Sequence, residues 1–339
     1  MAEIVPVVNS EKPALPTLWL DTSVVIKLTK IDQGEKLQEI EVQRCTRLKN
    51  LVHDLVRAGK LLCPESDHEE EYIARRLDDD VHRMFSALSL GISMIHRKGI
   101  EDIQVFTGMD AYVKGSHTID LPSSTYFRYD PVEKLEETLE RPFYITVGLA
   151  KSSELLQRSA VAKAEIERQW EELRQQLVAE GRTYEVQLAK EQRGYINGML
   201  ELVRKAEMNL RSGELNFWDY MGAFGALIYR NYWQSIGGVP PDWEGVHKFF
   251  CSPYFAELPL PYVSCRLLAE LLTGNEPIRS GDPMDAELLS VALPVAHYVL
   301  TDHRMKLRIE KLGLDRKFQT EVYSMSSIEG LFERLEELS

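Results

Sequence analysis

Two short acidic segments, near opposite ends of this 339-residue chain, contain the residues best suited to chemistry. In the first, Asp21 directly follows the apolar run 17–20. The second begins with Asp282 and Asp285 and ends where Asp302 follows the apolar run 297–301. A carboxylate at the end of a buried strand lies at the edge where open α/β sheets bind their ligands.

Carboxylates brought to one sheet edge from distant parts of a chain repel one another. The repulsion is roughly 4 kcal/mol for a pair 4 Å apart at an effective dielectric constant near 20. A cation bound among them would offset this cost. The pattern therefore predicts a divalent-metal site, with hydrolysis of a phosphodiester bond as its use.

Each carboxylate also has a purely structural interpretation. Asp21 could bond the backbone of the helix that follows it, and Asp302 could serve a turn. Asp282, with Pro283 after it, makes a good helix cap, and this interpretation is favoured over a catalytic one. Asp285 then falls in the first helical turn, where the helix dipole favours negative charge.

The elements that must position these residues follow a strand–helix alternation. Apolar runs at 17–20, 60–63, 297–301 and 320–323 are typical of short buried strands. Helices are expected between them, over the ranges 35–58, 65–73, 258–272, 282–293 and 328–338. Thr22 or Ser23 is expected to cap the helix after the first strand. The alternation predicts an α/β fold with a parallel sheet.

The rest of the chain suggests three parts. Residues 1–16 carry three prolines and form an N-terminal arm, 17–80 and 251–339 form the α/β core, and 81–250 form a mainly helical insertion. In the insertion we expect a helix over 84–95, strands over 103–106 and 143–147, and two long antiparallel helices over 151–211. Aromatic residues between 217 and 233 could stack on bases, although packing onto the core is favoured.

Composition narrows the functional classes. The formal net charge of −13 argues against a general nucleic-acid coat, but it does not exclude a nuclease whose own site is acidic. The four cysteines show no metal-binding spacing, which suggests a reducing environment. No signal peptide or convincing membrane span is evident, so we expect a cytoplasmic protein without a membrane partner.

Together, these segments resemble the PIN-like nuclease superfamily. The resemblance rests on Leu20-Asp21-Thr22-Ser23, an acidic helix after the second strand, Asp282-x-x-Asp285-Ala286 and Val299-Leu300-Thr301-Asp302. It covers roughly residues 17–76 and 255–325, under half of the chain. It implies a parallel sheet of four or five strands flanked by helices, a site that holds Mg²⁺ or Mn²⁺, and usually an RNA substrate. Asp21, Asp285 and Asp302 match the family's acidic positions best, with Asp282 as an additional contributor.

A fourth acidic position of the family lies in the helix after the second strand. The segment 65–71 offers several candidates; Glu70 is preferred, Glu69 is next, and the other carboxylates there are expected to be solvated. Lys27, Arg75 and Arg304 lie close in sequence to the acidic positions and could contact phosphates. The alternative is a non-catalytic PIN-like scaffold whose insertion binds a protein or nucleic-acid partner, and the chain could also form a homo-oligomer.

Overall fold

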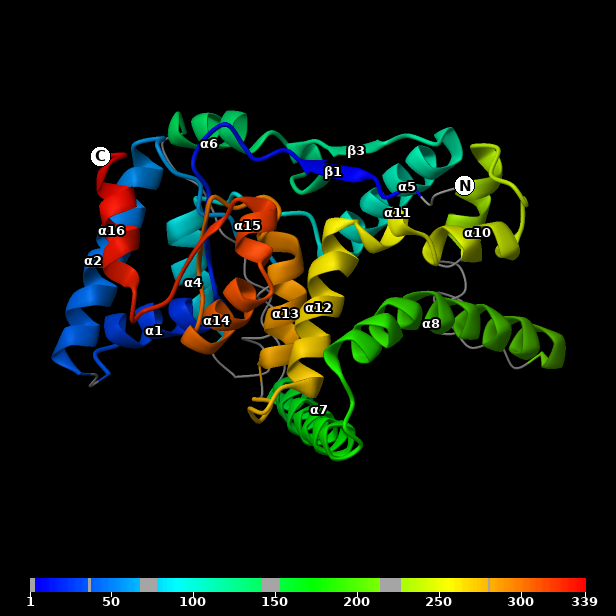
Figure 1. The fold of residues 1–339 in the computed structure, drawn as a ribbon. Coiled ribbons are helices and arrows are strands. Elements are labelled where there is room, and N and C mark those ends of the chain that lie inside the picture. The colour runs from blue at the N-terminus through cyan, green and yellow to red at the C-terminus, as the bar shows by residue number, and fades with distance from the viewer. Residues whose placement is uncertain (1–3, 36–37, 68–77, 142–152, 214–226, 280) are drawn as a thin grey trace.

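The computed structural model describes residues 4–35, 38–67, 78–141, 153–213, 227–279 and 281–339. The chain has an α/β fold that is mostly helical (Figure 1). The strands are β1 (Val7–Ser10), β2 (Leu18–Leu20), β3 (Thr118–Leu121), β4 (Tyr298–Leu300) and β5 (Glu321–Tyr323). The helices that surround the strands in the first half are α1 (Thr22–Asp32), α2 (Glu39–Arg57), α4 (Asp78–Ser89), α5 (Arg97–Lys114) and α6 (Pro131–Leu139).

The second half of the chain is almost entirely helical between its strands. Its helices are α7 (Ser153–Ala179), α8 (Tyr184–Ser212), α10 (Trp243–Phe250), α11 (Pro253–Ala256), α12 (Pro259–Thr273), α13 (Asp282–Ala292), α14 (His303–Lys311), α15 (Leu314–Phe318) and α16 (Ile328–Glu336). Within the described residues, no helix combines the length and the apolar character needed to cross a membrane.

The central sheet contains three parallel strands in the order β2-β4-β5. The register pairs Leu20 with Leu300, so the carboxyl ends of β2 and β4 lie side by side. The predicted strand over 60–63 makes only one parallel bridge, between Thr17 and Leu62. Pro64, which has no N–H to donate, follows this segment closely. The parallel sheet flanked by helices is confirmed, whereas the described residues form no continuous sheet of four or five strands.

Helices begin directly at the carboxyl ends of these strands. The predicted caps Thr22 and Ser23 are wrong, because Asp21 itself caps α1 through its side chain. Asp302 caps α14 in the same way after β4. Both carboxylates therefore lie where a strand stops and a helix starts.

The N-terminal arm is part of the folded structure. Its residues Val7–Ser10 form β1, which pairs in parallel with β3 in a separate two-stranded sheet. Lys12 then reaches back to the other sheet, where its ammonium group donates to the carbonyl oxygens of Ala296 and Gln319, at 2.7 Å each. The arm thus links the two sheets.

Two hydrophobic cores hold the structure together. The larger one surrounds β2, β4 and β5 and also includes Val81, Phe85 and Leu88 of α4. The smaller one lies among β3, α5, α10 and α11, at the right of Figure 1. Tyr229 and Trp233 are buried in it, which confirms packing rather than base stacking for these two aromatic residues.

Two expectations for the insertion are wrong. The range 103–106 is helical, because it continues the apolar face of α5, on which Val105 and Met109 are buried. The long helices over 151–211 are present as α7 and α8, but they are not a packed antiparallel pair: both pack against α12 and diverge from each other (Figure 1). The predicted strand over 143–147 lies outside the described residues.

The contact between β2 and β4 is reinforced by one histidine. His297 Nδ1 accepts a hydrogen bond from the Thr17 backbone N–H at 3.1 Å. Burial, together with the nearby charge of Lys12, lowers the pKa of His297 to about 4. The imidazole is therefore neutral while it accepts this bond at neutral pH.

Acid should destabilise the protein through this residue. Because the folded-state pKa lies below the ordinary value of 6.5, the unfolded chain binds an extra proton between pH 6.5 and about 4. Stability should fall as the pH falls through that window. In His297→Asn, whose amide oxygen can accept the same hydrogen bond, we expect the urea midpoint to depend less steeply on pH there. Parallel curves for the two proteins would contradict this role.

Candidate functional site

Asp21 is buried at the carboxyl edge of β2, with 1% of its surface exposed. Its Oδ1 accepts from the backbone N–H of Ser23 at 2.7 Å, which caps α1. Its Oδ2 accepts from the hydroxyl group of Thr301 at 2.8 Å. Its backbone N–H donates to Leu300. The carboxylate is thus fixed on both oxygens and tied directly to the end of β4.

Asp302 follows Thr301 and is half-buried. Its Oδ1 accepts from the backbone N–H groups of Arg304 and Met305, at 2.7 and 3.3 Å. Asp21 and Asp302 therefore follow neighbouring parallel strands and meet the same sheet edge, as the sequence predicts. The structural interpretation of Asp21, which bonds the backbone of the next helix, is also confirmed; Asp302 caps α14, whereas a role in a turn was expected.

Asp282 lies at the first residue of α13 and is 4% exposed. It is not the cap of that helix: Gly281 occupies the cap position, and Asp282 Oδ2 accepts instead from the backbone N–H of Arg279 at 3.0 Å. Arg308 Nη1 lies 3.7 Å from the same oxygen. Burial raises the pKa of Asp282, and the negative charge of Asp302 raises it further, while Arg279 and Arg308 oppose this rise. Asp282 and Asp302 thus interact electrostatically.

Asp285 lies in the first turn of α13, where the helix dipole favours its charge. It is half-buried, and its backbone N–H donates to Gly281. Its place on α13 is one helical turn after Asp282. This spacing is the geometry that the sequence motif predicts.

The acidic segment after the second strand is only partly described. Glu69, Glu70 and Arg75 lie outside the described residues. Glu65 and Asp67 are only partly exposed, whereas solvated side chains were expected. Glu65 pairs with His82 at 3.7 Å, and Asp67 accepts from the backbone N–H of Arg97 at 2.6 Å.

The chemistry of the donors suits a hard cation, since carboxylate and hydroxyl oxygens are preferred ligands of Mg²⁺ and Mn²⁺. Next to Asp21, the buried Thr22 hydroxyl makes no hydrogen bond within the described part of the chain. In that same part, no group of three or more His, Cys, Asp or Glu side chains is close enough together to hold a metal ion. A site with three or more carboxylate ligands would therefore require an acidic residue in addition to those described.

Two of the cations that were expected to contact phosphates form ion pairs. Arg304 ion-pairs with Glu276 at 2.6 Å, and Lys27 ion-pairs with Glu41 at 3.4 Å. The residue that sequence reasoning missed is Arg308, which is 8% exposed and lies one helical turn after Arg304. The only signal in the sequence was this spacing of two arginines on α14.

Comparisons of the chain with protein-family models, with curated proteins and with solved structures found no match. The resemblance to PIN-like nucleases therefore depends on the sequence motifs and remains a prediction.

The Thr301–Asp21 hydrogen bond can be tested by a matched pair of variants. Thr301→Val removes the buried donor to Asp21 Oδ2, which should lower the free energy of unfolding by about 1–3 kcal/mol. Thr301→Ser keeps the hydroxyl and loses only a methyl group, worth about 0.8 kcal/mol. Urea denaturation should rank the valine variant as the less stable. If serine costs as much as valine or more, the hydrogen bond is not the stabilising element.

Proposed function

We propose that this protein is a metal-dependent nuclease of PIN-like type, which hydrolyses phosphodiester bonds in RNA rather than DNA. The main support is the position of Asp21 directly after β2 and of Asp302 just past the end of the neighbouring parallel strand β4, with Thr301 between. Ligands of open α/β sheets bind at this edge. The choice of RNA follows from the resemblance of the motifs to that superfamily.

Asp21, Asp285, Asp302 and Glu70 would hold one or two Mg²⁺ or Mn²⁺ ions, with Asp282 contributing nearby. When bound, the metal supplies Lewis-acid stabilisation of the phosphate and activation of a water molecule. In this proposal Glu70, or Glu69 in its place, completes a ligand set of which the described residues provide only part.

The residues around the carboxylates orient them for this role. The Ser23 N–H and the Thr301 hydroxyl fix Asp21, so its carboxylate loses little freedom when it takes a ligand. The helix α14 fixes Asp302 through two backbone N–H groups. Such preorganisation lowers the cost of binding.

Asp21→Asn should abolish metal-dependent cleavage of a single-stranded RNA while the fold is retained. Asparagine caps helices about as well as aspartate, and the Thr301 hydroxyl can reverse its role and accept from the new amide. Because partners of metal ligands alone contribute about 10–100-fold to affinity or activity, loss of a direct ligand should cost more than about 100-fold.

Asp130→Asn is the matched control, since Asp130 caps α6 through the same kind of hydrogen bonds but lies on another helix. It should keep full activity. Normal cleavage by a folded Asp21→Asn protein would remove this residue from the mechanism.

A second candidate is a non-catalytic scaffold that binds a protein or nucleic-acid partner through its helical insertion. It is favoured by the fact that Asp21 and Asp302 both already have a structural task as helix caps. Thermal melting with Mn²⁺ separates the candidates. A metal that binds only the folded state raises the melting temperature, whereas no shift at millimolar Mn²⁺ would favour the scaffold.

A further inference from the structure

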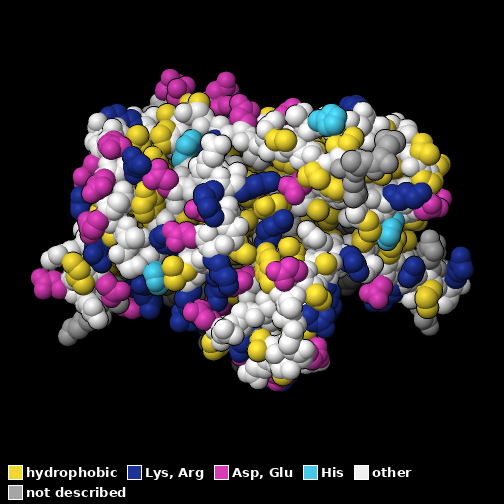
Figure 2. Space-filling view, in the orientation of Figure 1, with side chains coloured by type: hydrophobic (Ala, Val, Ile, Leu, Met, Phe, Trp, Pro, Cys, Tyr) yellow, Lys and Arg dark blue, Asp and Glu magenta, His cyan; other side chains and the backbone are white. Residues whose placement is uncertain are grey.

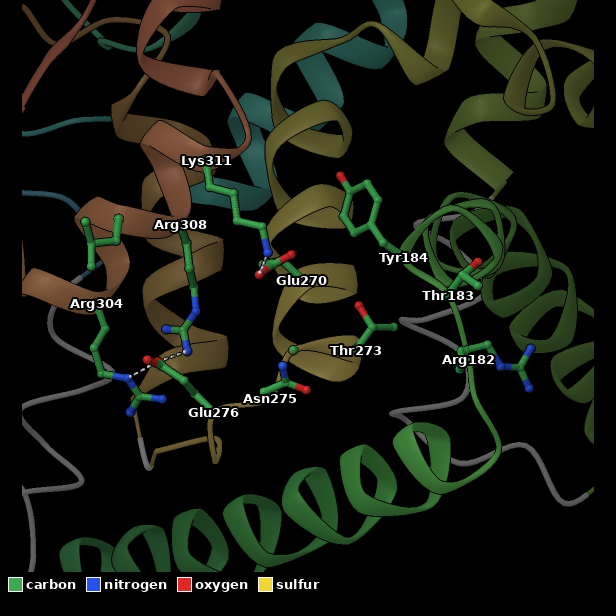
Figure 3. A pocket seen from close by; sticks show the side chains of 12 residues that line it. Arg182, Thr183, Tyr184, Glu270, Thr273, Asn275, Glu276, Arg304, Arg308 and Lys311 are labelled. Carbon is green, nitrogen blue, oxygen red and sulfur yellow. Dashed lines mark hydrogen bonds and ion pairs between the residues drawn. The ribbon is translucent and has the colours of Figure 1, made fainter.

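A polar pocket of about 530 Å³ lies between α12, α14 and the start of α8 (Figure 3). Arg304, Arg308 and Lys311, on successive turns of α14, form one wall. Figure 2 shows that Lys and Arg side chains also gather across the middle of this face of the molecule. Two carboxylates, Glu270 and Glu276, also line the pocket, and Glu270 ion-pairs with Lys311 at 2.6 Å. With Arg182 the lining has four cations against these two carboxylates, so it keeps a positive charge although the chain as a whole is acidic.

The two arginines already hold an anionic group. Glu276 Oε2 accepts from Arg304 Nε at 2.6 Å and from Arg308 Nη2 at 3.4 Å. The hydrogen bond from Arg304 lowers the pKa of Glu276, so its carboxylate stays ionised at neutral pH. The Glu276 side chain is 62% exposed, and nothing buried would have to move if it swung away. It marks the place where an external anion can bind.

Arg308 is held between two carboxylates, Asp282 on its buried side and Glu276 in the pocket. Its side chain is 9% exposed, and its Nη1 atom is buried and makes no hydrogen bond within the described residues. Asp282 lies 3.7 Å from Nη1, beyond hydrogen-bonding distance. The ion pair with Asp282 holds the guanidinium in place on this buried side, while Nη2 donates on the pocket side, where Glu276 lies. A guanidinium oriented in this way suits an anionic ligand with several acceptor oxygens.

The opposite wall adds neutral donors. Thr183 and Tyr184, at the start of the 29-residue helix α8, line the pocket. Burial raises the pKa of Tyr184 to about 12, so its hydroxyl keeps a proton to donate. The dipole of this long helix also favours an anion near its first turn, although the Val186 N–H donates to the Thr183 hydroxyl and Glu185 lies in that turn. At the end of α12, the Gly274 carbonyl oxygen accepts from Arg174 at 3.0 Å, which reduces its repulsion of an anion.

We propose that this pocket binds a phosphate group, gripped by Arg304 and Arg308 in exchange for Glu276. Guanidinium groups match phosphate oxygens in geometry as well as charge. The site does not depend on a metal ion or on the proposed nuclease activity. The phosphate can belong to a small phosphorylated ligand or to a nucleic-acid backbone.

The surface next to the pocket extends its positive charge along α8. Arg182 lines both this pocket and a neighbouring depression of about 610 Å³, to which Lys190 and Arg193 also contribute. A chain of cations spaced along one helix suits a ligand with several phosphates.

The test is titration of the metal-free protein, in EDTA and at constant ionic strength, with pyrophosphate by calorimetry. Arg308→Gln and Arg304→Gln should each weaken binding about tenfold or more, because each removes a charge-assisted hydrogen-bond donor. Glu276→Gln should tighten binding, since the competing carboxylate loses its charge while its shape is kept. Arg57→Gln, an exposed arginine at the end of α2, is the matched control and should bind as the wild type does.

A parallel titration with a single-stranded RNA oligonucleotide distinguishes the two sources of phosphate. If the variants change the affinity for RNA in the same order as the affinity for pyrophosphate, the pocket binds backbone phosphates. If they change only the affinity for pyrophosphate, the pocket binds a small phosphorylated ligand. The proposal is overturned if the wild type does not bind pyrophosphate at millimolar concentration, or if Arg304→Gln binds like Arg57→Gln and Glu276→Gln binds no tighter. A loss of binding by Arg308→Gln could also come from a folding defect. The gain of affinity predicted for Glu276→Gln could not, so this variant keeps the proposal testable. The result of these titrations does not depend on whether the Asp21→Asn variant cleaves RNA, so the phosphate site and the nuclease activity are tested separately.

Discussion

The pairing of β2 with β4 is the constraint on which the rest of the structure depends. Only three residues of each strand take part, and the contact is extended at both ends by side chains. Thr17 and His297 join the strands at the start, and Asp21 and Thr301 join them at the carboxyl edge. Because the pairing is parallel, Asp21 after β2 and the pair Thr301-Asp302 after β4 arrive at the same edge. The pairing therefore places two carboxylates from distant parts of the chain at one edge of the sheet.

The electrostatics of this region form one connected arrangement. Asp282 and Asp302 raise the cost of negative charge at the start of α13, and Arg308 offsets part of it from α14. The same arginine faces Glu276 in the adjoining pocket. The buried guanidinium of Arg308 therefore lies between the acidic edge and the polar pocket. A change of charge at one of these sites would alter the electrostatic energy of the other.

The sequence was informative where a local pattern and the tertiary environment agree. The runs at 17–20, 297–301 and 320–323 form strands, because short apolar segments flanked by turn residues have few alternatives in a buried sheet. The range 103–106 shows the opposite case, since its residues are compatible with either structure and the packing of α5 decides. The predicted antiparallel packing of α7 against α8 was wrong for a similar reason. An amphipathic helix face predicts that this face is buried, but it does not predict which element covers it; here both helices pack against α12.

For the candidate site, the sequence predicted the positions of Asp21 and Asp302 but not their hydrogen bonds. Their role as caps was open, because a capping and a ligating aspartate have the same local sequence. Arg308 could not have been predicted, since burial of a guanidinium depends on helices brought together from three parts of the chain.

The link between Thr301 and Asp21 spans 280 positions of sequence. During synthesis on the ribosome, β2 emerges before β4, and its buried face stays uncovered until the residues between them have been made. Contacts of such long range form slowly and leave apolar surface exposed in the meantime. The nascent chain is therefore vulnerable to aggregation during this interval, and recombinant yield should respond to slower synthesis or added chaperones.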